Sequence, residues 1–155
     1  MMEPKLEFAF TVTIRLRPPA MYLRPSLSGA ERAAIYLQDG TFEGPNIRGR
    51  VLPNSGGDWP MVRLDGVIDF DARYLLEEED GTIIYVQNRG YRWGTPEVME
   101  RMRQQQPVDP SEYYMRVAPK FEVAQGKHDW LARYVFIGIA EKIPAGNSIA
   151  YYKVL

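Results

Sequence analysis

Apolar and polar residues alternate with a period of two in many short segments of this chain. The segment 67–76 is the clearest case, because one of its faces is apolar and the other carries charged residues. The apolar face holds Phe70, Ala72, Tyr74 and Leu76. Side chains alternate between the two faces of a strand, so this pattern predicts a strand with one face in the core.

Asp-Gly pairs separate several of these segments and predict tight hairpins, because both turn residues adopt positive φ. They occur at 39–40, 65–66 and 80–81. We expect nine strands, at about 5–16, 32–38, 41–53, 60–64, 67–77, 82–91, 111–123, 132–142 and 148–155. Residues 17–31 are then the one long irregular connection, where we expect a lid or a partner contact.

One helix is expected near 96–105, with Thr95 as its N-cap, Pro96 in its first turn and its end before Pro107. The many short sequential strands predict an antiparallel meander, and closure into a barrel hides its edges most completely. We therefore predict an all-β fold, a closed antiparallel β-barrel of eight to ten strands, lipocalin-like in shape, formed by the single domain 1–155. A sandwich is the alternative. A barrel of this size can hold one small ligand.

Composition removes several classes of function. Lys and Arg number 19 against 20 Asp and Glu, so a nucleic-acid partner is not expected. Without cysteine and with a single histidine, we expect no metal site, and neither phosphate-loop nor dinucleotide glycine motifs predict a cofactor. The acidic, proline-containing start and the lack of a long apolar run predict a soluble, cytoplasmic protein without a membrane partner. The sequence neither predicts nor excludes a homo-oligomer.

The loop Asn54-Ser55-Gly56-Gly57 delivers a carboxylate, Asp58, beside Trp59. An apolar ring against a carboxylate raises its pKa by desolvation, which would suit acid or base chemistry. The alternative is a carboxylate that accepts hydrogen bonds from loop amides.

Two strands carry the remaining candidates. In 111–123, Tyr114 and Arg116 share one face, and the other face is apolar. If the Tyr114 face is inward, a phenol and a guanidinium could stabilise an oxyanion; if it is outward, Arg116 is an exterior ion-pair partner. The segment 83–94, with Tyr85 and Asn88, gathers polar and aromatic residues as a barrel mouth would, or as an ordinary exposed strand end would.

The segments 40–59, 65–92 and 108–131 together resemble the domain-of-unknown-function family 3237. The matching motifs are Gly-Thr-Phe-Glu-Gly-Pro at 40–45, Gly-Gly-Asp-Trp at 56–59, Asp-Gly-Thr-Ile-Ile-Tyr-Val-Gln-Asn-Arg-Gly-Tyr-Arg at 80–92 and Asp-Pro-Ser-Glu-Tyr-Tyr-Met-Arg at 109–116. The resemblance implies a soluble bacterial or fungal β-barrel, with some members acting as cofactor-independent cyclases or related enzymes in natural-product pathways. The residues that match the family pattern are Asp58, Arg73, Asn88, Tyr114, Arg116, Glu122 and Trp130.

These observations favour a cofactor-independent enzyme that cyclises, isomerises or eliminates an apolar, aromatic or polyketide-like small molecule. Proton transfer with oxyanion stabilisation is the chemistry that the remaining side chains can supply. We expect Asp58 to be the general acid or base, and Tyr114 and Arg116 to stabilise the oxyanion. The expected substrate-binding residues are Trp59, Arg73, Tyr85, Asn88, Glu122 and Trp130. A non-catalytic carrier and an interaction protein with a filled barrel are the alternatives.

Overall fold

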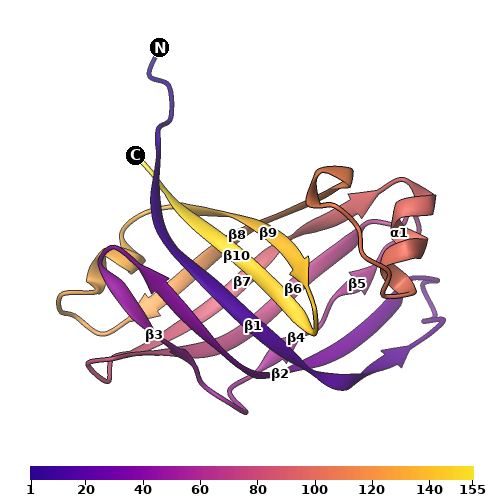
Figure 1. Ribbon diagram of the computed structural model, residues 1–155, viewed down its shortest axis with the longest axis horizontal. Coiled ribbons are helices and arrows are strands. Elements are labelled where there is room, and N and C mark those ends of the chain that lie inside the picture. Colours follow the sequence, from indigo (N-terminus) through magenta and orange to yellow (C-terminus); the bar gives the residue numbers. More distant parts are fainter.

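The computed structural model describes residues 1–155 as one β-barrel with a single α-helix at one end (Figure 1). Its elements are β1 (Leu6–Leu23), β2 (Glu31–Gly44), β3 (Ile47–Val51), β4 (Gly57–Asp58), β5 (Met61–Val62), β6 (Ile68–Glu78), β7 (Ile83–Gly94), α1 (Pro96–Arg103), the 3-10 helix η1 (Pro110–Glu112), β8 (Tyr113–Val123), the 3-10 helix η2 (Asp129–Ala132), β9 (Phe136–Ile143) and β10 (Gly146–Val154). No helix is both long and apolar enough to cross a membrane.

The sheet closes on itself because β1 pairs with β10 on one side and with β2 on the other. All the pairings are antiparallel. The short strands β3, β4 and β5 follow one another between β2 and β6, and together they fill a single position in the wall. The barrel therefore has eight strand positions, and the predicted closed antiparallel barrel is confirmed.

Two of the three predicted Asp-Gly hairpins are present, with Gly66 at φ +86° and Gly81 at φ +88°. The third, at Asp39-Gly40, is wrong, because β2 continues through it and turns only after Gly44. Gly40 is needed there for a different reason: a Cβ would lie 2.2 Å from the Thr13 carbonyl oxygen of β1. The glycine allows close approach of two strands instead of reversing the chain.

The expected irregular connection at 17–31 is also wrong in its extent. Strand β1 continues to Leu23 and pairs there with Arg32 of β2, so the connection covers only 24–30. The register shifts between Arg17 and Met21, where Pro18 and Pro19 lie. Prolines lack the N–H that a ladder needs, and an irregularity of this kind accommodates them.

The predicted helix is confirmed as α1. The Thr95 side chain accepts a hydrogen bond from the Val98 amide at 3.3 Å, and Pro96 occupies the first turn. The strand expected at 132–142 begins only at Phe136, because η2 occupies its first residues.

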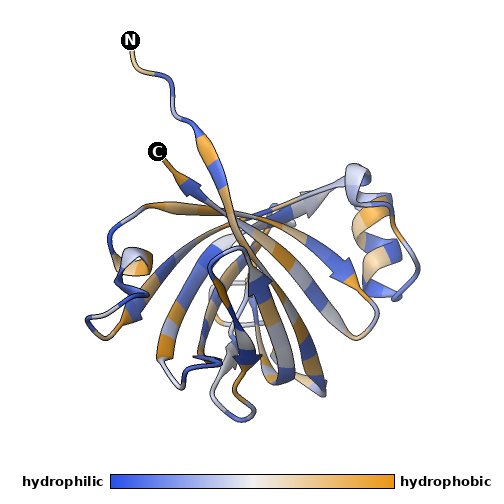
Figure 2. Cartoon of the chain, turned by 60° about the vertical axis from the view of Figure 1, so that its left-hand side comes forward, coloured by the Kyte–Doolittle hydropathy of each residue, from blue (hydrophilic) through white to orange (hydrophobic).

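The interior of the barrel has two halves along its axis, and they differ in how side chains fill them. Hydrophobic and hydrophilic residues alternate along several strands (Figure 2), which places one face of each strand inside. At the η2 end the interior is filled by aromatic rings 5.2–5.9 Å apart between centroids, namely Phe10, Phe42, Phe121, Phe136 and Tyr151. Such rings bury large areas and supply much of a core's stabilisation. The interior toward α1 is lined mostly by aliphatic residues and holds a cavity.

Candidate functional site

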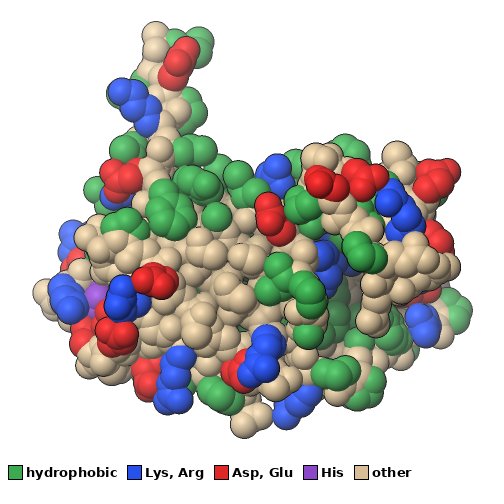
Figure 3. All heavy atoms as spheres, in the orientation of Figure 1, with side chains coloured by type: hydrophobic (Ala, Val, Ile, Leu, Met, Phe, Trp, Pro, Cys, Tyr) green, Lys and Arg blue, Asp and Glu red, His purple; other side chains and the backbone are tan.

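A cavity of about 170 Å³ occupies the unfilled half of the barrel. Most of its lining is apolar, and the polar side chains among it are few. On the outside, the space-filling view shows a hollow on the α1 side that is bordered by hydrophobic side chains (Figure 3). The polar lining residues are Tyr22, Asp58, Tyr74, Asn88, Arg92, Lys142 and Asn147. An apolar cavity with a few convergent polar groups is the usual form of a small-molecule site.

Asp58 reaches the cavity from β4, a two-residue strand held between β2 and β6. The segment must run very close to β6, since a Cβ on Gly56 would lie 1.8 Å from the Arg73 carbonyl oxygen. Asp58 Oδ1 accepts a hydrogen bond from the Asp71 amide at 3.0 Å. Burial among the apolar lining nevertheless raises the pKa of Asp58 to about 6.

Two cations share this cavity with Asp58. Arg92 comes from β7, and its guanidinium lies 5.9 Å from the centre of the Phe70 ring. Lys142 comes from β9 at the mouth, and it is exposed to solvent. Burial lowers the pKa of Arg92, and it lowers the pKa of Lys142 to about 8, with the positive charge of Arg92 as a further cause. Neither cation forms an ion pair with Asp58, although the charge of Asp58 acts on the pKa of both.

Four buried polar atoms on residues that line this cavity have no hydrogen-bond partner in the protein. They are Tyr74 Oη, Asn88 Oδ1, Arg92 Nε and Asn147 Oδ1. The Asn88 amide does donate to Tyr151 Oη at 2.9 Å, so one side of Asn88 is fixed. Leaving a buried polar atom unpaired costs about 1–3 kcal/mol, and four such atoms around one cavity are unusual. Their grouping indicates a site for a ligand with polar atoms.

Of the residues predicted for the site, the structure brings only Asp58 and Asn88 to the lumen. Six others lie on the outer face of the wall: Trp59, Arg73, Tyr85, Tyr114, Arg116 and Glu122. Trp59 packs edge-on against Tyr36 at 6.2 Å, so this ring is not what desolvates Asp58. Trp130 lies at the opposite end of the barrel, 6.0 Å from the Phe136 ring.

The expected roles of Tyr114 and Arg116 are therefore corrected. Their neighbours Met115 and Val117 line the cavity, which turns Tyr114 and Arg116 to the outside. There Tyr114 stacks on Trp93 at 5.6 Å, and the Arg116 guanidinium lies 5.2 Å from the Tyr114 ring centre. The apolar face of β8 is the inner one, as the burial preference of apolar residues favours.

The sequence interpretation missed Arg92 and Lys142. The position of Arg92 can be inferred from the sequence, because Arg92 lies four residues after Asn88 on the same strand and therefore shares its face. Lys142 gives a weaker signal: it shares a face with Ala140 on β9, next to the turn into β10.

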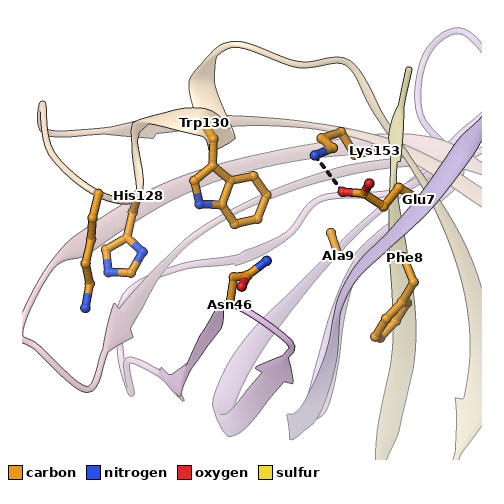
Figure 4. A pocket seen from close by; sticks show the side chains of 8 residues that line it. Glu7, Phe8, Ala9, Asn46, His128, Trp130 and Lys153 are labelled. Atoms are coloured by element: carbon orange, nitrogen blue, oxygen red, sulfur yellow. Dashed lines mark ion pairs between the residues drawn. The ribbon is translucent and has the colours of Figure 1, made fainter.

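A second, larger pocket of about 350 Å³ lies at the opposite end of the barrel (Figure 4). Its lining residues are Glu7, Phe8, Ala9, Asn46, Lys127, His128, Trp130 and Lys153. Lys153 Nζ pairs with Glu7 at 2.6 Å, so its main charges are neutralised within the protein. We place the candidate site in the lumen, where the charges lack partners.

One group of three side chains has the spacing to hold a metal ion: Glu78, Asp80 and His128. His128 Nε2 lies 2.9 Å from Asp80 Oδ2 and 3.4 Å from Glu78 Oε2. Both carboxylates already accept backbone hydrogen bonds of the β6–β7 turn, from the amides of Asp80 and Thr82. This cluster therefore fixes the turn between β6 and β7.

The chain belongs to the family described as "Protein of unknown function (DUF3237)", whose model matches residues 4–154. A UPF0311 protein of Rhodopseudomonas palustris is 33% identical over 141 residues, which are 91% of this chain and 92% of that protein. The solved structure of the R. palustris protein superposes with a TM-score of 0.89 and covers 99% of this chain and 100% of that one. A β-barrel-like protein of Acinetobacter baumannii is 34% identical, with a TM-score of 0.86, and covers 100% of this chain and 98% of that one.

One more distant relative is an enzyme by name. A hydroalkoxylation enzyme of Penicillium herquei is 27% identical over 153 residues, which are 97% of this chain and 84% of that protein. The solved structure of an enzyme from P. herquei shares the barrel with a TM-score of 0.75 at 24% identity, covering 100% of this chain and 97% of that one.

Proposed function

We propose that this member of the DUF3237 family is a cofactor-independent enzyme that transfers protons on a small, largely apolar molecule, so that the molecule is cyclised, isomerised or undergoes elimination. The observation that carries the proposal is the placement of Asp58 opposite Arg92 and Lys142 in one apolar cavity, with no ion pair between them. A carboxyl group with a pKa of about 6 exchanges its proton readily near neutral pH.

Each group then has a distinct role. Asp58 takes a proton from an acidic O–H or C–H of the substrate, and Arg92 and Lys142 stabilise the negative charge that forms on oxygen. Asp58 returns the proton to carbon. In an addition of a hydroxyl group across a C=C bond, the O–H bond and the π bond of the C=C group break while one C–O and one C–H bond form, so no electrons leave the substrate. The name of the fungal relative supports this reaction type.

The test is turnover of a panel of ortho-prenylated phenols, each with a hydroxyl group next to a C=C bond, in D2O. Cyclisation leaves the composition unchanged, and a new C–D bond appears as a mass increase in the product. We expect Asp58→Asn to lower the rate by about 10²-fold or more, since a general acid or base contributes about 10²- to 10⁴-fold. Asp39→Asn, on the exposed surface opposite Arg15, is the matched control and should leave the rate unchanged.

Two results would contradict the proposal. An Asp58→Asn variant with full activity would remove Asp58 from the chemistry. A panel that binds without any turnover would identify the protein as a carrier. In a carrier, Arg92→Gln would weaken binding and there would be no catalytic rate to measure.

A further inference from the structure

The charges that face the lumen do not balance. Arg92 and Lys142 carry two positive charges, and Asp58 carries at most one negative charge. Outside the lumen, most arginines have a carboxylate partner, as Arg15 has Asp39 and Arg50 has Glu77. Arg92 has no such partner, and its buried Nε makes no hydrogen bond. A charge that is partly removed from water without a partner is costly, so the half-buried Arg92, with the exposed Lys142 beside it at the mouth, points to a ligand that supplies the missing charge.

Both cations of the lining come from one side of the cavity, the side formed by β7 to β10. Strands β7, β9 and β10 contribute Asn88, Arg92, Lys142 and Asn147. Apart from Tyr22, strands β1, β2 and β5 contribute apolar side chains to the lining: Ile14, Leu16, Ala33, Ile35, Leu37 and Val62. A ligand that satisfies both sets of side chains has a charged end and an apolar body.

We infer that the lumen binds an organic monoanion whose ionised oxygen lies against Arg92 and Lys142 and whose body is apolar. This inference rests on the site of the proposed function and names its substrate class. The enclosed volume of about 170 Å³ is well below the roughly 300–1,000 Å³ of sites for drug-sized ligands. The enclosed part of the ligand is therefore of one or two rings, and any longer part extends through the mouth. The shared chemistry is a carboxylate or a phenolate.

The inference is tested by calorimetric titration with 2-naphthoate and its neutral counterpart 2-naphthamide, which have nearly the same shape. We expect the acid to bind at least ten-fold more tightly than the amide, because hydrogen bonds to charged groups contribute about 1.5–3 kcal/mol. Arg92→Gln and Lys142→Gln should each weaken the acid about ten-fold and leave the amide unchanged. Arg89→Gln and Lys120→Gln, exposed on the outer faces of β7 and β8, are the matched controls.

Asp58→Asn should change the affinity for 2-naphthoate in the opposite direction to Arg92→Gln and Lys142→Gln. Removing the one negative charge of the lumen should tighten 2-naphthoate by a few fold, which a variant that merely unfolds cannot do. A second probe, 4-nitrophenol, separates phenolate from carboxylate binding. The ionised form of 4-nitrophenol is yellow. A site that selects the phenolate should therefore turn the solution yellow at a pH about one unit below the pKa of the free phenol.

Equal affinity for the acid and the amide, or no measurable binding of 2-naphthoate and 4-nitrophenol, would overturn the inference. The two proposals fail separately. Turnover that depends on Asp58 but shows no preference for anions would leave the proposed function standing and refute the monoanion. Preference for the acid without turnover of any phenol would refute the enzyme and leave the anion site.

Discussion

The buried carboxylate of Asp58 should lower the stability of the protein in a pH-dependent way. Burial raises its pKa from an ordinary 3.8 to about 6. Between these two values the folded chain holds a proton that the unfolded chain has released. The contribution of Asp58 to the free energy of unfolding therefore falls as pH rises from about 4 to about 6, and it is level above that range.

The size of the effect follows from the difference in pKa. One pKa unit corresponds to about 1.4 kcal/mol, so a difference of about two units amounts to about 3 kcal/mol at pH 7 and above. Asp58→Asn removes this ionisation and keeps an oxygen that can accept the hydrogen bond of the Asp71 amide. The variant should be more stable than the parent by up to about 3 kcal/mol at neutral pH and equally stable near pH 4.

Urea unfolding of the parent and of Asp58→Asn at several values from about pH 4 to pH 8 measures this difference directly. Asp39→Asn is a control of opposite sign, because the Arg15 guanidinium lowers the pKa of Asp39 and removing this carboxylate should not stabilise the protein at neutral pH. A stability difference that does not vary with pH, or an Asp58→Asn variant that is weaker than the parent at neutral pH, would refute the reasoning that burial controls this group.

Three further substitutions test the rest of the structure. Tyr151→Phe leaves the buried Asn88 amide without its acceptor, and urea unfolding should show a loss of about 1–3 kcal/mol. Phe121→Ala opens a cavity in the aromatic half, and the same measurement should show a loss of about 3–5 kcal/mol; a loss below about 1 kcal/mol would mean that this half is not the stabilising one. Arg116→Ala removes a side chain from the outer face, so this variant should bind 2-naphthoate as tightly as the parent does in a titration. A ten-fold loss of affinity would mean that Arg116 belongs to the binding site.

The sequence was sufficient for the barrel because its local signals agree with one another. Period-two alternation sets the inner face of β6, and the two Asp-Gly turns that form are those at which no other strand needs the glycine. Gly40 was misread because a glycine can serve either a turn or a close approach, and only the partner strand decides. Residues 17–23 were misread because prolines weaken a strand locally, while pairing with β2 restores it.

The site was only half predictable for a related reason. Asp58 could be found because the Gly-Gly-Asp loop is a local signal, and Asn88 because its strand loads polar groups toward one end. Arg92 and Lys142 come from β7 and β9, which lie on either side of β8 in the sheet, so their meeting depends on the order and curvature of the strands and leaves no local signal. Tyr114 and Arg116 sit one residue away from inward positions, and a single step along a strand reverses the face.

Side-chain size explains why the site lies at the α1 end. Aromatic residues fill the half near η2, and small residues, Ala33, Ala72 and Ala140, line the other half. The filled half can stabilise the barrel independently of the cavity, so the open half can keep a carboxylate at a raised pKa and cations without partners. Binding sites often retain such unfavourable groups where a rigid scaffold tolerates their cost. The same eight strand positions thus separate a filled half from an open half along the barrel axis, and an isolated change in one half should leave the other half intact.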